Sequence, residues 1–248
     1  MATLREYVEL AADVYTSWVE AGGAPDGWRI QPGMFIDDAP FWTPGARFGS
    51  SGLQCRAYRR ERGNEVVIAY KGTKPTMLSD LRADAGITFY VEPVQMKEAL
   101  RNTQRWLGGL RGVARISLTG HSLGGAIAQY VGSHTGKQFV TFNAPGMLAN
   151  TSGLCASPWI DQNLKKGTNY IMLGDAIGNF GRHIGDTVRI NRLGLARVAL
   201  AGVASALTVG STALGSAAAS LGQHGIANFR EYLEAGDPRF DPDDDPLA

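Results

Sequence analysis

The chain of 248 residues is long enough for one large α/β domain with a substantial core, and 44% of its residues are hydrophobic. Its 24 basic and 23 acidic residues nearly cancel without forming a dense cluster of Lys and Arg, which argues against DNA or RNA as a partner. Two cysteines, Cys55 and Cys155, lack the spacing of a zinc site and are too few for a disulfide framework, so only a single bridge stays open.

The first 70 residues predict one helix, one long connection and two strands. Apolar residues recur at helical spacing over residues 4–19, which indicates an amphipathic helix that packs on the core. Residues 25–52 are rich in Pro, Gly and aromatic side chains and predict an irregular surface connection. Short apolar runs at residues 53–58 and 66–70 predict two strands joined by a polar turn.

The rest of the chain alternates between helical and strand patterns. Residues 96–110 predict a helix, residues 113–119 the strand after it, and residues 138–142, 169–173 and 187–190 three further strands. Strands interleaved with helices predict a mostly parallel central sheet with helices on both faces. In such sheets the chemistry collects beyond the C-terminal ends of the strands.

A G-x-S-x-G motif, Gly120-His-Ser-Leu-Gly124, joins a strand-like segment to a helix-like segment. A serine hydroxyl becomes a useful nucleophile when it is held clear of the chain, with a base beside it and amide donors in front. A sharp turn from strand to helix lifts the side chain above the sheet and leaves free N–H groups at the helix start. Ser122 is therefore the candidate nucleophile.

The candidate acid is chosen by its place relative to the strands. Asp175 comes just after the strand predicted at residues 169–173, where its carboxylate would share an edge of the sheet with Ser122. Asp161 has no strand before it, and Asp186 precedes a strand and would project from the opposite edge. Asp175 is thus the expected orienting acid, with an ordinary turn aspartate as the competing interpretation.

Three histidines other than His121 are candidates for the base. His224 follows the acid in the chain order Ser, Asp, His that α/β-hydrolases use, so it is the first choice. His183 is the second and His134, on the helix after Ser122, the third. His121 adjoins the nucleophile and is expected to pack below the turn.

An acyl transfer also needs donors for the oxyanion of its tetrahedral intermediate. The amide of Leu123, directly after the nucleophile, is one candidate. The amide of Thr73, in the segment Tyr70-Lys-Gly-Thr73 that follows a strand toward the same edge, is the other. Nothing in the pattern implies a metal or an organic cofactor.

These segments together resemble the class 3 (fungal-type) lipases of the α/β-hydrolase superfamily and their bacterial relatives. The likeness rests on Ile116-Ser-Leu-Thr-Gly-His-Ser-Leu-Gly-Gly125, on Tyr70-Lys-Gly-Thr73, on Thr141-Phe-Asn-Ala-Pro-Gly146, and on Asp175 and His224 in their places along the chain. It implies an α/β-hydrolase fold, a triad of Ser122, Asp175 and His224, and backbone oxyanion donors at Thr73 and Leu123.

The resemblance covers residues 50–235 and implies a carboxylic-ester hydrolase, a lipase or phospholipase that acts on acyl lipids through an acyl-enzyme. Two rival functions stay open. A small-ester or thioester hydrolase would share every catalytic residue, whereas a membrane-inserting protein would act through residues 198–221 and would not need Ser122. Peripheral contact with a membrane is a further expectation.

Residues 198–221, between the candidate acid and base, contain no charged side chain, and Leu recurs there at every seventh position. An apolar helical segment is expected, with three readings: a buried core element, a cap over the active site that contacts lipid, or a weak membrane span. The domain is expected to cover residues 1–236. Residues 237–248 are acidic and proline-rich and predict a flexible tail.

The N-terminal residues lack the uninterrupted apolar stretch of a signal peptide, so synthesis without a conventional export signal, in the cytoplasm, is expected. Some bacterial relatives of this kind are delivered into rival cells by specialised secretion machines and carry an immunity partner. By analogy, non-classical export and an immunity protein are expected here as well.

Overall fold

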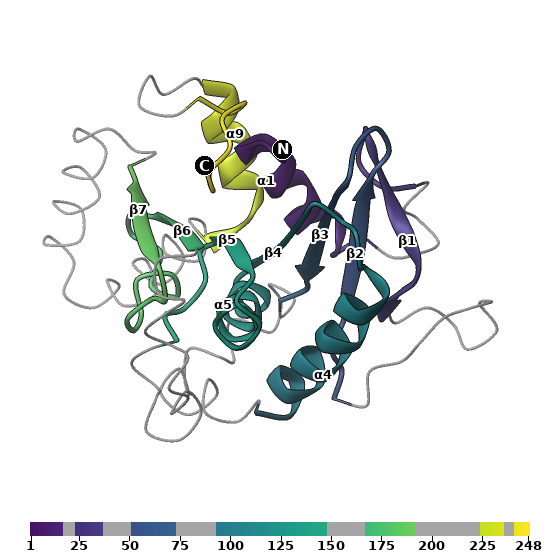
Figure 1. Cartoon of the computed structure of the whole chain (residues 1–248). Coiled ribbons are helices and arrows are strands. Elements are labelled where there is room, and N and C mark those ends of the chain that lie inside the picture. Colours follow the sequence, from purple (N-terminus) through teal and green to yellow (C-terminus); the bar gives the residue numbers. More distant parts are fainter. Residues whose placement is uncertain (17–22, 37–50, 73–92, 148–166, 192–223, 236–240) are drawn as a thin grey trace, which may run out of the picture.

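The computed structural model describes residues 1–16, 23–36, 51–72, 93–147, 167–191, 224–235 and 241–248. The described helices pack on a single sheet (Figure 1), and they are α1 (Leu4–Asp13), α4 (Pro93–Gly109), α5 (Leu123–Thr135) and α9 (Ala227–Ala235). The strands of that sheet are β1 (Trp28–Ile36), β2 (Cys55–Arg60), β3 (Glu65–Tyr70), β4 (Arg115–His121), β5 (Gln138–Phe142), β6 (Gly167–Met172) and β7 (Asp186–Ile190).

The seven described strands lie in the sheet in the same order as in the sequence. Strands β1, β2 and β3 pair antiparallel, and β3 to β7 pair parallel. The four parallel pairs place the C-terminal ends of β3, β4, β5 and β6 along one edge. The expected mostly parallel sheet with helices on both faces is confirmed.

Two hydrophobic clusters cover the two faces of the sheet. On β3, Val66, Ile68 and Tyr70 belong to one cluster, which α4 and α5 complete, whereas Val67 and Ala69 belong to the other, which α1 and α9 complete. This alternation follows from the two-residue period of a strand. All six residues of β3 are buried because both faces of the strand are covered.

The N-terminal helix begins as its sequence predicts but is shorter than the predicted pattern. Thr3 and Glu6 form a capping box, in which each side chain accepts a hydrogen bond from the other residue's backbone amide. Helix α1 ends at Asp13, and residues 17–22 lie outside the described part of the chain.

Strand β1 corrects the expectation that residues 25–52 form an irregular connection. Trp28 to Ile30 pair with β2, and the pairing resumes at Phe35 after an irregularity that contains Pro32. A proline cannot donate a ladder hydrogen bond, which hides the strand in the sequence and is tolerated because β1 lies at the edge of the sheet.

The C-terminal residues 241–248 make defined contacts, in contrast to the flexible tail that their composition predicts. The carboxylate of Asp245 accepts two hydrogen bonds from Arg115, at 2.5 and 3.0 Å, and the carbonyls of Pro246 and Leu247 accept hydrogen bonds from Thr168 and Gln138. The amide of Leu4 also donates to the carbonyl of Asp244, so the two ends of the chain lie side by side (Figure 1). Charge pairing thus anchors a segment that is too polar to bury itself.

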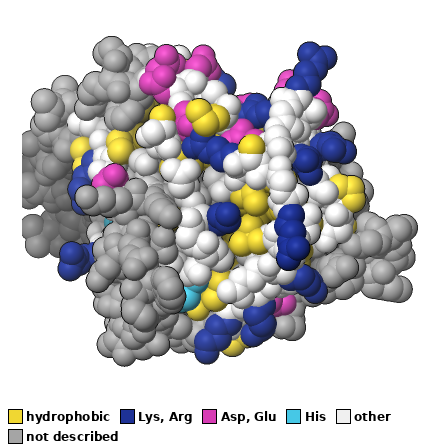
Figure 2. All heavy atoms as spheres, in the orientation of Figure 1, with side chains coloured by type: hydrophobic (Ala, Val, Ile, Leu, Met, Phe, Trp, Pro, Cys, Tyr) yellow, Lys and Arg dark blue, Asp and Glu magenta, His cyan; other side chains and the backbone are white. Residues whose placement is uncertain are grey.

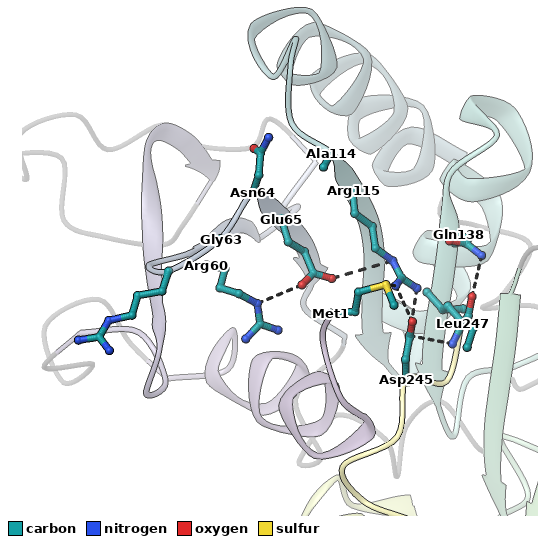
Figure 3. Close-up of a pocket in the computed structure, with 12 residues that line it drawn as sticks. Met1, Arg60, Gly63, Asn64, Glu65, Ala114, Arg115, Gln138, Asp245 and Leu247 are labelled. Atoms are coloured by element: carbon teal, nitrogen blue, oxygen red, sulfur yellow. Dashed lines mark hydrogen bonds and ion pairs between the residues drawn. The ribbon is translucent and has the colours of Figure 1, made fainter.

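Figure 3 shows the pocket that this anchored segment helps to form, with Glu65, Arg115 and Gln138 in its wall. These three residues begin β3, β4 and β5, so the pocket lies at the N-terminal edge of the sheet. The chemistry of a parallel α/β sheet is expected at the opposite edge, where Ser122 follows β4.

Among the described residues, no helix combines the length and the apolar character that crossing a bilayer requires. The apolar segment 198–221 lies outside the described residues, as does Cys155. Cys55 is buried in β2.

Candidate active site

Ser122 occupies a sharp turn between the end of β4 and the start of α5. Its backbone has φ 57° and ψ −130°, a conformation that side-chain-bearing residues rarely adopt. A serine that precedes a helix usually turns its hydroxyl back to cap a helix amide, but Ser122 makes no such bond. The strained backbone therefore holds the hydroxyl away from the helix, at a cost of about 1–3 kcal/mol.

The turn is possible because glycine flanks it. A Cβ atom on Gly120 would lie 2.4 Å from the carbonyl carbon of Gly124, far inside van der Waals contact. The strand and the first turn of the helix therefore approach each other more closely than any other residue at position 120 would allow.

The three residues of the predicted triad meet in one hydrogen-bonded chain. The Nε2 atom of His224 lies 2.8 Å from the Oγ atom of Ser122, and its Nδ1 atom lies 2.9 Å from Oδ2 of Asp175. All three side chains are buried, with exposed fractions of 1 to 2%. The low polarity of such surroundings strengthens each of these hydrogen bonds.

Asp175 is held in place by the loop that follows β6. Its carboxylate accepts hydrogen bonds from the amides of Ile177 and Gly178, at 3.1 and 3.2 Å, as well as from His224. These donors satisfy the ionised form and fix the direction in which it faces the imidazole. The carboxylate is thus preoriented by backbone amides.

The competing candidates lie elsewhere in the structure. His183 faces the carbonyl of Ala144 at 2.8 Å, and burial lowers its pKa below the ordinary value. His134 bonds to the carbonyl of Tyr130 within α5. Asp186 is exposed at the start of β7, at the opposite edge of the sheet, and Asp161 lies outside the described residues.

Only one of the two predicted oxyanion donors lies in the described part of the chain. Leu123 is the first residue of α5. A backbone N–H group at this position has no acceptor within the helix and points out of the helix beyond its first turn. Thr73 lies outside the described residues. The described chain ends one residue earlier at Gly72, whose amide donates to the hydroxyl of Tyr15 at 3.0 Å.

His121 and Tyr15 are the site residues that sequence reasoning missed. The Nε2 atom of His121 lies 2.6 Å from the carbonyl oxygen of His224, and its Nδ1 atom lies 3.1 Å from the hydroxyl of Tyr15. His121 carries a weak signal in its place beside the nucleophile. Tyr15 carries none, because an aromatic residue in an amphipathic helix is an ordinary core residue. Within the described residues, no group of three or more His, Cys, Asp or Glu side chains could hold a metal ion.

The sequence matches the model of a phospholipase-like family over residues 6–229. That family is described as the Tle-like phospholipase domain. The chain belongs to the Tle-like phospholipase domain family. The matched residues run from α1 into α9 and so include Ser122, Asp175 and His224. The chain is a carboxylic-ester hydrolase of the lipase and phospholipase type, as the resemblance in the sequence implied.

Solved structures agree at the level of the fold. The Rhizomucor miehei lipase in its propeptide complex aligns with a TM-score of 0.51 at 14% identity, over 75% of this chain and 67% of that one. A deletion mutant of the same complex aligns with a TM-score of 0.51 at 14% identity, over 76% of this chain and 66% of that one. The Rhizomucor miehei triacylglyceride lipase aligns with a TM-score of 0.50 at 14% identity, over 75% of this chain and 78% of that one.

The chain thus spans about two thirds of the length of the lipase chains in the propeptide complexes. Identities this low show a shared fold alone. No curated protein sequence matches the chain significantly.

Proposed function

We propose that this protein hydrolyses an acyl ester bond of a phospholipid, with Ser122 as nucleophile, His224 as general base and Asp175 as the orienting acid. The observation that carries the proposal is the continuous hydrogen-bonded chain from Ser122 through His224 to Asp175. Membership of a phospholipase-like family supports the phospholipid as substrate class.

The first half of the proposed reaction forms an acyl-enzyme. Nε2 of His224 takes the proton of the Ser122 hydroxyl while Oγ attacks the ester carbonyl carbon. Asp175 accepts the Nδ1–H bond, which keeps the imidazole in the tautomer whose Nε2 is free to take the proton, and stabilises the cation that forms. The tetrahedral intermediate collapses when His224 protonates the departing alcohol oxygen.

The second half releases the fatty acid. Water gives a proton to His224 and attacks the acyl carbon, and collapse of the second intermediate returns the proton to Ser122. In both halves the amides of Leu123 and Thr73 are proposed as oxyanion donors, each worth about 3–4 kcal/mol in the transition state.

Substitution of the nucleophile tests the chemistry. We expect Ser122→Ala to lower the hydrolysis of phospholipid about 10⁴-fold or more, with the fold retained as judged by circular dichroism and melting temperature. Parent-like turnover by this variant would refute the proposal and would favour a protein that acts through residues 198–221. The parent protein should also cleave long-chain phospholipid faster than short soluble esters and thioesters. The reverse order would favour the small-ester or thioester hydrolase.

Peripheral contact with the membrane is part of the same proposal, and two features of the surface support it. Exposed apolar side chains lie near the catalytic edge of the sheet, Val94 at the start of α4 and Leu173 just after β6, with exposed fractions of 57% and 42%. The exposed side of α4 carries Lys97, Arg101 and Arg105 at four-residue spacing (Figure 2), which suits anionic headgroups.

Charge reversal tests this contact. We expect the double variant Lys97→Glu and Arg101→Glu, in the half of α4 nearer the catalytic edge, to bind vesicles that contain phosphatidylserine roughly 10-fold more weakly than the parent. The control is the double variant Arg62→Glu and Arg111→Glu, which changes the net charge by the same amount at the opposite edge of the sheet. It should bind these vesicles as the parent does. Equal losses in the two variants would refute a specific contact through α4.

An immunity protein that binds this enzyme and a non-classical export route are proposed by analogy with bacterial relatives. Co-purification of a single inhibitory protein from the producing cell would test the first. Recovery of the enzyme outside intact producing cells would test the second.

A further inference from the structure

A hydrogen-bonded chain separate from the triad joins the two sides of the active site. It begins at the amide of Gly72, which donates to the Tyr15 hydroxyl, continues to Nδ1 of His121, and leaves Nε2 of His121 for the carbonyl oxygen of His224. Gly72 stands directly before Thr73, a proposed oxyanion donor. The chain therefore connects the strand end that leads to this donor with the backbone of the proposed base.

The donor and the acceptor of each hydrogen bond follow from the carbonyl group of His224, which ends the chain. A carbonyl oxygen only accepts, so Nε2 of His121 carries the hydrogen that points to His224. In a neutral imidazole Nδ1 is then an acceptor, so the hydroxyl of Tyr15 donates its one proton there at 3.1 Å, and the carbonyl oxygen of His121 lies 3.3 Å from the same hydroxyl as a second acceptor. The same hydroxyl oxygen accepts from the amide of Gly72, whose N–H can only donate. A single tautomer of His121 thus satisfies every member of the chain.

The protonation states agree with this arrangement. Burial, reinforced by the nearby His224, lowers the pKa of His121 to about 3. Its ring is therefore neutral at pH values well above 3. Burial also raises the pKa of Tyr15 above its ordinary value, so the hydroxyl keeps the proton that it donates.

Further contacts fix the chain near Tyr15 and at the carbonyl of His224. Arg56, fully buried in β2, donates to the carbonyls of Asp13 and Thr16, which flank Tyr15 on either side. At the other end Asn143, just after β5, donates to the same carbonyl of His224 at 3.1 Å. The network therefore links fixed points rather than mobile surface groups.

Steric contact leaves the strand end little freedom to move independently of Tyr15. A Cβ atom on Gly72 would lie 2.5 Å from the Tyr15 hydroxyl and 2.5 Å from the carbonyl oxygen of His121. Displacing any one of these groups must displace the others, because backbone and side chain are in direct contact.

We propose that Tyr15 and His121 are positioning residues for the hydrolysis, which together set the separation between the oxyanion strand end at Gly72 and the base at His224. The inference rests on the proposed function, since it assigns an effect on catalysis to residues that touch neither the substrate nor the reacting atoms. Misplacing catalytic groups by about 1 Å costs up to roughly 100-fold in rate.

Removal of one hydroxyl provides the test. We expect Tyr15→Phe to lower kcat on a soluble p-nitrophenyl ester by roughly 10- to 100-fold, with KM within about twofold of the parent value. The matched control is Tyr7→Phe on α1, the helix that ends two residues before Tyr15. The hydroxyl of Tyr7 bonds the hydroxyl of Ser117 on β4 at 2.7 Å, away from the catalytic edge, and its loss should leave kcat unchanged.

A pair of substitutions at His121 tests the other half of the chain. His121→Phe removes both hydrogen bonds, whereas His121→Gln retains an amide that can donate to the carbonyl of His224. We therefore expect kcat to fall in the order parent, His121→Gln, His121→Phe. The assays are run well below the melting temperature of each variant, and the fraction of folded enzyme is measured by circular dichroism.

Parent-like kcat in Tyr15→Phe, or equal losses in Tyr15→Phe and Tyr7→Phe, would overturn the positioning role and leave the proposed function standing. Full turnover by Ser122→Ala, assayed beside them, would instead overturn the proposed function. A loss confined to Tyr15→Phe and the His121 variants, with activity abolished in Ser122→Ala, supports both.

Discussion

A Cβ atom on Gly124 would lie 2.1 Å from the carbonyl oxygen of Tyr70, so the helix after the nucleophile meets the end of β3 backbone against backbone. Neither partner is a flexible side chain that could move aside. This contact fixes how closely the start of α5, which carries Leu123, approaches the end of β3.

Gly124→Ala is therefore expected to lower kcat and to destabilise the protein by about 1–3 kcal/mol, since the added methyl group forces the backbone apart. The matched control is Gly108→Ala on α4, where a Cβ atom would meet nothing within 4 Å. That variant should be as stable as the parent or up to about 1 kcal/mol more stable. Chemical denaturation and steady-state kinetics check both, and a neutral Gly124→Ala would contradict the close contact.

The two leading histidines should differ sharply in their effect on the reaction. His224→Ala is expected to lower kcat/KM about 10⁴-fold, because the hydroxyl of Ser122 loses its base. His183→Ala should retain most of the activity, since the imidazole of His183 bonds the carbonyl of Ala144 instead. Labelling of Ser122 by a fluorophosphonate gives an independent measurement. Fast labelling in the His224 variant together with none in the His183 variant would reverse the assignment.

Stability should depend on pH through His121. Its pKa is lowered to about 3 in the folded protein, whereas a histidine in an unfolded chain titrates near 6.5. Between these values the unfolded state binds the extra proton, so stability falls as pH falls from about 6.5, by about 2 kcal/mol on reaching pH 5. His183, whose pKa is also lowered, adds to the slope in the same direction.

Denaturation of the parent and of His121→Gln at pH 5 and pH 7 isolates this contribution. The slope of stability against pH should be shallower in the variant, whatever its absolute stability. Identical slopes would show that His121 is not held neutral in the folded protein.

The ion pair between Asp245 and Arg115 should anchor the C-terminal segment. Both side chains are mostly buried, with exposed fractions of 12% and 16%, so Asp245→Asn is expected to destabilise the protein by about 1–2 kcal/mol. Asp243 lies in the same acidic segment with 75% of its side chain exposed, and Asp243→Asn should change stability by less than about 0.5 kcal/mol. Equal effects of the two substitutions would refute the anchor.

Local sequence patterns were sufficient for much of the fold and for the nucleophile. The strand, the turn and the helix around Ser122 are adjacent in the chain, so periodicity and glycine placement predict them together. The parallel pairing of β3, β4 and β5 follows from strands that alternate with the helices α4 and α5. Strand β1 was not predicted, because Pro32 interrupts its sequence pattern. The strand forms through its pairing with β2, which the sequence pattern does not show.

Contacts between distant residues were decided only by the tertiary structure. Chain order favoured His224 over His183 as the base, but only the packing places His224 2.8 Å from Ser122, which lies 102 positions away along the chain. The hydrogen bond between Tyr15 and His121 spans 106 positions. The tail is polar in composition, yet Arg115 on β4 provides the charge that anchors Asp245. A sequence determines such contacts only through the sum of many packing interactions, whereas a turn or a helix start depends on a few neighbouring residues.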